Sequence, residues 1–522
     1  MRKFNTTGPC FPDEHYMLPA LDRLPGIREL VAGGNYFVVH APRQTGKTTA
    51  LQALVREINE KGDMFAIYCT LETMQNATDV DDTMIKICKL LRRAVFATPE
   101  LVHRLGNPDV ALAISQESGW TVTAVSDTLA ALCRKAGKPV VVFFDEADCL
   151  VGDVLISFLR QLRDGYVNRK LIPFPKSIAL VGMLDVRDYK AQIRSDGESL
   201  GQISPFNIIA EDMLIPNFSE SDIRALYAQH TAATGQVFAD GVVEDVWRLT
   251  RGQPWLVNAI VRECVEEIHD FRYGDLITAD DVEIAKETII RRRDTHVDSL
   301  MERLREPRVR RLVEPVIFGG ERTLSRDSED WRFVTDLGLL KENESRELVP
   351  ANRMYAEIIG RYLTRDVQDD MAKSVLETPW ATPDGLDMVG LMAAFQSFWR
   401  ENSGADRHVH DYNEATPHLV LMAFLQRVTN GEGRITREMA LGSGRLDLCV
   451  EFRGHKYAIE VKTKKNFAGE KSYGQLAAYL DHLGLAEGWM PIFDADSDKP
   501  WADRIYSRDV DFAGKLIHVV GL

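Results

Sequence analysis

Hydrophobic and polar residues alternate along two adjoining segments near the C-terminus, Asp447–Arg453 and Lys456–Lys462. Strict period-two alternation predicts two β-strands, each with one apolar face. The intervening Gly454-His455 pair predicts a two-residue turn of type II′, which has glycine at its first central position. Folding about that turn sets Asp447 directly opposite Lys462, so the pattern predicts a β-hairpin with this register.

The polar face of this hairpin brings Asp447, Glu460 and Lys462 within one cross-strand diagonal, roughly 7 Å or less. The two carboxylates supply hard oxygen ligands of the kind that Mg²⁺ prefers, and the lysine supplies an adjacent cation. The other interpretation of the pattern alone is an amphipathic hairpin whose charged face is solvated. Glu451, Arg453 and Lys456 decorate the same face and need no special role.

The order Asp447…Glu460-Val461-Lys462 resembles the motif of the PD-(D/E)XK nuclease superfamily, with an aspartate on one strand and E-x-K on the next. Gln475 and Tyr479 follow in helix-forming sequence and match the Q-x-x-x-Y signature of a branch that includes exonuclease domains of recombination enzymes. Glu414 precedes an apolar helical run, where these nucleases often place a further metal-orienting glutamate. Leu446 stands before the aspartate in place of proline, at a position that varies in the superfamily.

This resemblance covers roughly residues 405–522 and implies an active site. The implied catalytic residues are Asp447, Glu460, Lys462, Gln475, Tyr479 and Glu414, with Asp447 and Glu460 as the metal ligands.

A second pattern lies near the N-terminus, where the apolar run Tyr36–His40 leads into Ala41-Pro-Arg-Gln-Thr-Gly-Lys-Thr-Thr49 and then a helical stretch. Strand, loop and helix in this order are the context that a P-loop requires. Lys47 would reach the β and γ phosphates, and Thr48 would ligate Mg²⁺. Ala41 replaces the first glycine of the motif, which is compatible with the loop if position 41 avoids positive φ. The expected phosphate-binding residues are Arg43, Gln44, Thr45, Gly46, Lys47, Thr48 and Thr49.

The apolar run Pro139–Phe144 ends in Asp145-Glu146 and looks like a Walker B strand. Asp145 would hold Mg²⁺ and Glu146 would polarise the attacking water. Met64–Thr70 and Ser177–Gly182 supply further strands, and Asp185 or Arg187 is favoured as a γ-phosphate sensor after the second. Strands that alternate with helical segments imply a parallel sheet covered on both faces.

Ser219–Asp222 opens a helical subdomain with a capping-box-like start. Within it, Gly252-Gln253-Pro254 resembles the G-x-P element of the STAND and archaeal-type ATPases of the AAA+ class. In those proteins the proline-bearing helix start closes over the nucleotide, whereas a plain turn before a helix is the other interpretation. Residues 295–365 resemble the winged helix appended to such ATPases, with binding to DNA and packing on the ATPase both left open.

The chain is therefore expected to be an α/β protein with five segments. These are a P-loop ATPase core (1–215), a helical lid (216–294), a winged-helix-like segment (295–365), a linker (366–385) and a PD-(D/E)XK nuclease-like domain (386–522).

Composition and charge limit the partners and the cellular location that the chain is expected to have. The 522 residues carry a formal net charge of −15, so the surface as a whole does not attract nucleic acid. Basic clusters lie at residues 291–311, where a solvated helix face is the alternative, and among the lysines at 462–471. No apolar run is long enough to cross a bilayer, the N-terminus lacks a signal-peptide core, and the 7 cysteines include no C-x-x-C pair. We expect a cytoplasmic protein without a membrane partner.

These patterns together predict an ATP-binding and ATP-hydrolysing protein that controls a Mg²⁺-dependent nuclease, with ATP and Mg²⁺ as cofactors. Its expected partner is nucleic acid, DNA rather than RNA, and defence against foreign DNA is one role by analogy; a homo-oligomer is left open. The alternative is a STAND-like regulatory NTPase switch whose C-terminal domain binds nucleic acid or a partner without cutting. A motor such as a helicase is less favoured because no second ATPase core follows in the chain.

Overall fold

The computed structural model describes residues 2–105, 123–183, 208–318, 328–370, 380–383, 385–402, 416–429, 433–441, 444–494 and 499–522. The chain divides into two compact units, Met1–Arg303 with Leu324–Met354, and Leu304–Thr323 with Tyr355–Leu522. This division crosses residues 295–365, so the segment expected to form one winged helix contributes elements to both units.

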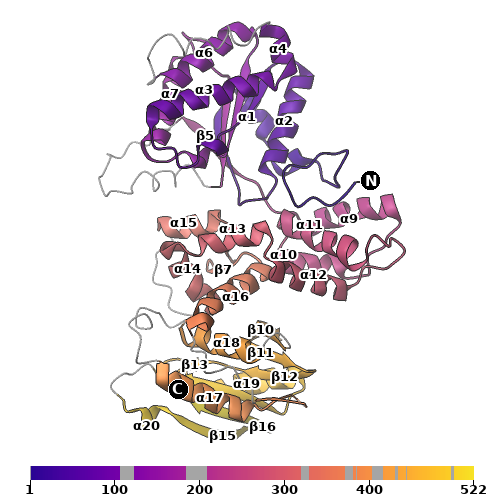
Figure 1. Cartoon of the computed structure of the whole chain (residues 1–522), viewed down its shortest axis with the longest axis vertical. Helices are drawn as coiled ribbons and strands as arrows, with labels where there is room; N and C mark the ends of the chain where they lie inside the picture. Colours follow the sequence, from indigo (N-terminus) through magenta and orange to yellow (C-terminus); the bar gives the residue numbers. More distant parts are fainter. Residues whose placement is uncertain are drawn as a thin grey trace. The chain divides into compact units, whose positions relative to one another are not determined.

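A parallel sheet of five strands forms the centre of the first unit, in the order β2-β3-β4-β1-β5 (Figure 1). The strands are β1 (Tyr36–His40), β2 (Phe65–Thr70), β3 (Val140–Asp145), β4 (Ser177–Gly182) and β5 (Ile209–Leu214). The helices are α1 (Ile27–Gly33), α2 (Lys47–Lys61), α3 (Val80–Phe96), α4 (Pro99–Leu105), α6 (Ala124–Ala136) and α7 (Gly152–Asn168). The expected parallel sheet is confirmed.

The position of β3 inside the sheet explains why residues 140–144 are all apolar. Val141 and Phe143 pack in the core cluster that α1 and α2 complete on one face of the sheet. Phe144 points to the other face, where its ring lies 5.1 Å from that of Phe158 in α7. Because both faces are covered, both sets of alternating positions must be apolar.

A helical segment follows β5 and is called the lid after its expected role. It opens with the expected capping box, which Ser219 and Asp222 form at the start of α9. Its elements are α9 (Glu220–Thr234), α10 (Val242–Thr250), α11 (Pro254–Arg262), the π-helix η5 (Glu263–Ile268) and α12 (Ala279–Arg292). Tyr227 and His230 of α9 are buried against Phe4 from the N-terminal segment. The lid core is thus completed by residues that precede the ATPase sheet in the sequence.

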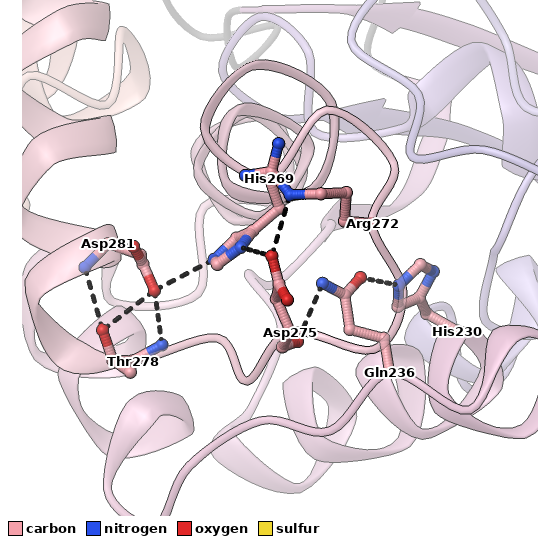
Figure 2. A network of polar contacts seen from close by, with 7 residues as sticks. All are labelled: His230, Gln236, His269, Arg272, Asp275, Thr278 and Asp281. Carbon is pink, nitrogen blue, oxygen red and sulfur yellow. Dashed lines mark hydrogen bonds and ion pairs between the residues drawn. The ribbon is translucent and has the colours of Figure 1, made fainter.

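A polar network joins the end of η5 to the start of α12 within the lid (Figure 2). His269 lies between two carboxylates, with Nδ1 3.5 Å from Asp275 Oδ2 and Nε2 3.2 Å from Asp281 Oδ2. Asp281 also completes a second capping box with Thr278. These contacts join the end of η5 to the start of α12 through side chains as well as through the loop between them.

Residues 295–370 form α13 (Thr295–Arg303), α14 (Pro307–Phe318), α15 (Glu329–Asp336), the antiparallel pair β6 (Leu340–Glu342) and β7 (Leu348–Pro350), and α16 (Arg353–Asp370). The helix, strand, turn and return strand expected here are all present. Helix α16 continues to Asp370 and so includes the first residues of the segment expected as a linker, 366–385. The short strands β8 (Ala381–Thr382) and β9 (Gly385–Leu386) occupy its end.

A mixed sheet forms the centre of the second unit, in the order β10-β11-β12-β14-β16-β15, with β13 paired to β14. The strands are β10 (Gly433–Leu441), β11 (Gly444–Phe452), β12 (His455–Ile459), β13 (Lys462–Thr463), β14 (Glu487–Phe493), β15 (Tyr506–Phe512) and β16 (Lys515–Gly521). The helices are α17 (Met388–Asn402), α18 (Thr416–Thr429), α19 (Glu470–Leu483) and α20 (Trp501–Arg504). Leu476 and Leu480 of α19 join the apolar cluster on one face of this sheet.

All seven cysteines lie in the described part of the chain and are free thiols. In the residues that the structure covers, no helix has the length and apolar character needed to cross a membrane.

Candidate functional site

The P-loop connects the carboxyl end of β1 to α2. Gln44 and Gly46 adopt positive φ, 58° and 94°, whereas Ala41 does not belong to the positive-φ residues. Ala41 therefore satisfies the condition under which alanine can replace the first glycine of the motif. Thr45 Oγ1 donates to the carbonyl of Pro42 at 2.8 Å and braces the loop across its base.

Lys47 begins α2 and is buried. Its Nζ donates to the carbonyl oxygens of Ala41 at 2.7 Å and Pro42 at 3.0 Å, so the ammonium lies inside the loop that it is expected to share with phosphate. Burial lowers the pKa of Lys47, while the nearby carboxylates of Glu146 and Asp148 oppose that shift. A bound phosphate would replace neutral carbonyl acceptors with charged ones, which bind an ammonium group more strongly.

Asp145 ends β3 beside the P-loop. Its Oδ2 accepts hydrogen bonds from Thr48 Oγ1 at 2.8 Å and from the Tyr68 hydroxyl at 2.7 Å. Its Oδ1 accepts the backbone N–H of Glu146 at 3.0 Å. The structure thus brings together Thr48 and Asp145, and their hydroxyl and carboxylate oxygens fit a hard cation such as Mg²⁺.

Glu146 follows at once with a φ of 55°. This left-handed conformation is uncommon for a residue other than glycine and is found more often at active sites. Burial raises the pKa of the Glu146 carboxyl, and the neighbouring Lys47 ammonium lowers it in part. A half-buried carboxylate with a raised pKa suits a residue that accepts a proton from water.

A cavity of about 110 Å³ adjoins the P-loop. Its wall comes from the N-terminal segment, the P-loop and the lid, and includes Asn5, Cys10, Tyr16, Arg23, Gln44, Thr45, Gly46, Thr49, Phe218, Pro254, Trp255 and Asn258. Pro254 at the start of α11 therefore shares a cavity with the loop that it was expected to close over. Arg43 points elsewhere, since its Nη1 donates to Ser299 Oγ at 2.8 Å.

The sequence patterns do not predict that the N-terminal segment contributes to this site. The backbone N–H of Cys10 donates to Thr49 Oγ1 at 3.0 Å, and the indole Nε1 of Trp255 donates to the Thr6 carbonyl at 2.9 Å. Arg23 Nη1 donates to the Thr45 carbonyl at 2.8 Å, and burial lowers the pKa of Arg23 to about 10. No local pattern marks these residues, because each contacts an element far along the chain.

The hairpin in the second unit has a register different from the expected one. Leu448 pairs with Ile459 and Phe452 with His455, so the turn is Arg453-Gly454 rather than Gly454-His455. Both turn residues have positive φ, 49° and 82°, which is a type I′ turn and not type II′. The guanidinium of Arg453 over the Phe452 ring, 5.0 Å from its centroid, and its bond to the Thr382 carbonyl stabilise the unusual conformation.

In the observed register, the partner of each residue differs by two positions from the expected partner. Each side chain therefore stays on the face of the sheet predicted for it. The pairing sets Asp447 next to Glu460 instead of Lys462. The other interpretation, a polar face that is only solvated, does not hold along the whole face, because Cys449 and Ala458 are buried beneath α19. Near the turn, Lys456 on the same face stays exposed, and the polar group lies at the other end of the strands.

Five predicted residues of the second unit form one chain of hydrogen bonds. Lys462 Nζ donates to Glu460 Oε1 at 2.7 Å and to Gln475 Oε1 at 3.3 Å. Gln475 Nε2 in turn donates to the Tyr479 hydroxyl at 3.1 Å. Asp447 joins through the backbone, because its Oδ2 accepts the Val461 N–H at 2.8 Å and its own N–H donates to Glu460 Oε2 at 3.5 Å.

The buried position of Glu460 dominates the electrostatics of this cluster. The residue is 1% exposed, and burial raises the pKa of its carboxyl while the Lys462 ammonium lowers it in part. Two carboxylates beside a lysine supply the hard oxygen donors that Mg²⁺ prefers. The described residues contain no group of three or more His, Cys, Asp or Glu side chains arranged for a metal ion. Glu414, Asp185 and Arg187 lie outside the described residues.

Comparison with known proteins supports the first site. Residues 31–189 match the family model for an AAA domain, and no curated protein matches the sequence. Among solved structures, the chain is similar to the Walker-type ATPase of Pyrococcus abyssi, with a TM-score of 0.48, 15% identity, and coverage of 68% of this chain and 99% of that one. It is also similar to Cdc6p from Pyrobaculum aerophilum, with a TM-score of 0.36, 13% identity and coverage of 68% and 93%.

A further similarity is to the Thermotoga maritima RuvB Holliday junction branch migration motor, with a TM-score of 0.33, 12% identity, and coverage of 65% of this chain and 92% of that one. The TM-scores of these structures are below 0.5. The identification of the ATPase domain depends instead on the family match and on the geometry of the P-loop, Asp145 and Glu146. Residues 31–189 therefore form a P-loop ATPase domain of the AAA type.

Proposed function

We propose that this chain is an ATP-controlled, Mg²⁺-dependent nuclease that acts on DNA. The single observation that carries the nuclease part is the hydrogen-bonded chain from Glu460 through Lys462 and Gln475 to Tyr479, with Asp447 beside it. Asp447 and Glu460 are 13 positions apart in the sequence, as are Lys462 and Gln475, and these residues converge in the order and types of the nuclease motif. A structural role alone gives no reason for two carboxylates and a lysine at one end of the strands.

Asp447 and Glu460 would hold Mg²⁺ in this site, and the bound ion would supply Lewis acidity at the scissile phosphate. The Lys462 ammonium, already directed by Glu460 and Gln475, would stabilise negative charge that develops on the phosphate oxygens. The Tyr479 hydroxyl accepts from Gln475 Nε2, which turns the amide oxygen toward Lys462. Tyr479 and Gln475 would thus be positioning residues that act through the lysine.

The ATPase domain would provide control. Lys47 and the P-loop amides would bind the phosphates of ATP, Thr48 and Asp145 would hold Mg²⁺, and Glu146 would accept the proton of the attacking water. Pro254 and Trp255 at the start of α11 line the same cavity as the P-loop. Binding and hydrolysis would therefore change the lid, and through it the nuclease.

Cleavage assays on the purified full-length protein test this proposal. We expect the wild type to degrade DNA in Mg²⁺, and Asp447→Ala or Lys462→Ala to lower the rate about 100-fold or more while ATP hydrolysis continues. Glu451→Ala is the matched control, because this carboxylate lies on the same strand near the turn and pairs with Lys456. Metal-dependent cleavage that survives in both site variants would contradict the assignment. Binding without cleavage by the wild type would support the regulatory switch instead.

A further inference from the structure

Two lysines share one carboxylate near the proposed nuclease site. Lys464 Nζ lies 2.9 Å from Asp494 Oδ2, and Lys499 Nζ lies 3.1 Å from the same oxygen. Asp494 is 9% exposed, whereas the side chains of Lys464 and Lys499 are 57% and 37% exposed. The carboxylate is thus sheltered, and the two ammonium groups reach the surface of a protein with a net charge of −15.

The strand pairing sets this pair on the same side of the sheet as the proposed site. Lys462 pairs with Ile492, which packs in the cluster beneath α19, and Thr463 pairs with Phe493. The Phe493 ring contacts Trp399 of α17 on the opposite face, with centroids 5.0 Å apart. Lys464 comes next, and its N–H donates to the Phe493 carbonyl at 2.8 Å. This bond continues the pairing with β14 by one residue, into the turn after β13, and the contact with Asp494 places the Lys464 side chain on the face of Lys462.

This arrangement suits an extended polyanion rather than a single ion. An ammonium group has three N–H donors, so Lys464 can keep its bond to Asp494 and donate to a second oxygen. Asp494 also restricts two flexible side chains that would otherwise lose conformational freedom on binding, and such preorganisation favours affinity. The Asp494 N–H donates to the carbonyl of Leu522 at 2.8 Å, which fixes the backbone that carries the carboxylate.

We propose that Lys464 and Lys499 form a binding subsite for a backbone phosphate next to the scissile one. This inference rests on the proposed nuclease function and identifies how the substrate strand would be held. The ligand chemistry is a phosphodiester of a polynucleotide, and the strand would run from Lys462 toward Lys464 and Lys499. In the opposing interpretation, the lysines and Asp494 only stabilise the end of the sheet.

Salt-dependent binding distinguishes these two interpretations. The full-length protein carries Asp447→Asn to prevent cleavage, and binding of a fluorescein-labelled DNA oligonucleotide is followed by anisotropy across a KCl series. The variants are Lys464→Gln, Lys499→Gln and their combination. Lys456→Gln is the matched control, because this lysine is 47% exposed and is also ion-paired, at the opposite end of the hairpin. A thermal melt of each variant checks that it is folded.

We expect the double variant to bind at least fivefold more weakly at 0.1 M KCl, with Lys456→Gln unchanged. The slope of log affinity against log salt should fall by about 0.7 to 0.9 for each phosphate contact that is lost. Unchanged affinity and slope in a folded double variant would overturn the subsite. A lower melting temperature with unchanged binding would do the same and support the structural interpretation.

A cleavage assay without Asp447→Asn separates this subsite from the proposed function. If the wild type cuts DNA and the double variant cuts with the same KM, the subsite is wrong and the nuclease stands. If lysine-dependent binding is found and the wild type does not cut, the subsite stands and the nuclease is wrong. If the wild type neither binds nor cuts single-stranded DNA, duplex DNA or RNA, both are overturned.

Discussion

The hydroxyl of Tyr68 donates to Asp145 Oδ2 across 2.7 Å, in the centre of the ATPase site. The same oxygen accepts from Thr48 at 2.8 Å. Burial and the Asp145 carboxylate raise the pKa of Tyr68, so its hydroxyl stays protonated and remains a donor. Tyr68 therefore fixes the carboxylate that is expected to hold Mg²⁺.

Tyr68→Phe should raise the Mg²⁺ concentration needed for half-maximal ATP binding about tenfold. A hydrogen bond to a charged group contributes about 1.5 kcal/mol or more, which corresponds to that factor. Titration of a fluorescent ATP analogue with Mg²⁺ measures the change. Tyr36→Phe is the control, because it also removes a hydroxyl that donates a hydrogen bond, here to the Pro175 carbonyl, from β1 of the same sheet. An equal rise in both variants would contradict a specific role for Tyr68.

Lys47→Ala should weaken ATP binding and, if ATP controls the nuclease, change DNA cleavage as well. The ammonium is the group directed into the P-loop, where it bonds the carbonyls of Ala41 and Pro42. Lys47→Met retains most of the buried volume and separates loss of charge from loss of packing. Equilibrium binding of ATP and the cleavage rate with and without ATP are the measurements. Cleavage identical to wild type under both conditions would show that the proposed control is wrong.

Gly252→Ala should destabilise the first unit by about 3 kcal/mol or more, since the new methyl group meets the backbone in a left-handed conformation. Gly252 has φ +73°, and a Cβ would lie 1.8 Å from the Phe218 carbonyl oxygen. Gly235 has φ +82° with no atom within 4 Å of a Cβ. Gly235→Ala should therefore cost only about 1 to 2 kcal/mol. Urea unfolding measures both, and equal losses would mean that the contact with Phe218 relaxes without cost.

His296 should make the first unit sensitive to acid. The side chain is buried, with its ring centroid 4.7 Å from Trp255, and burial lowers its pKa to about 3, with Arg43 adding to the effect. Between its pKa in the folded chain and the ordinary value near 6.5, only the unfolded chain binds the proton. Stability is therefore fully present above about pH 6.5 and falls by about 1.4 kcal/mol for each pH unit below it.

Urea unfolding at pH 7.5, 6.0 and 5.0 tests this dependence. His296→Phe should flatten the curve, whereas His455→Gln at the exposed start of β12 should leave it unchanged. A slope that persists in His296→Phe would mean that other groups cause the loss of stability in acid.

Local patterns were sufficient for the elements of the first site. The apolar run into Gly46-Lys47-Thr48, and the run that ends in Asp145-Glu146, each contain their own strand and turn signals. Parallel pairing then brings the carboxyl ends of the strands to one edge. The cavity beside them could not be predicted in this way, because Thr6, Cys10 and Arg23 reach Trp255, Thr49 and Thr45 only in the folded chain.

The hairpin shows most clearly which features follow from the local sequence pattern and which depend on contacts made in the folded chain. Period-two alternation determined which side chains share a face, so Asp447, Glu460 and Lys462 stay together even though the predicted turn is wrong by one residue. The tertiary structure decided the register, since Arg453 can hold a positive φ once Thr382 and Phe452 contact its side chain. It also decided that α19 covers the middle of the second face, at Cys449 and Ala458. Alternation is a property of the strand alone, whereas register and burial depend on partners that the strand meets only on folding.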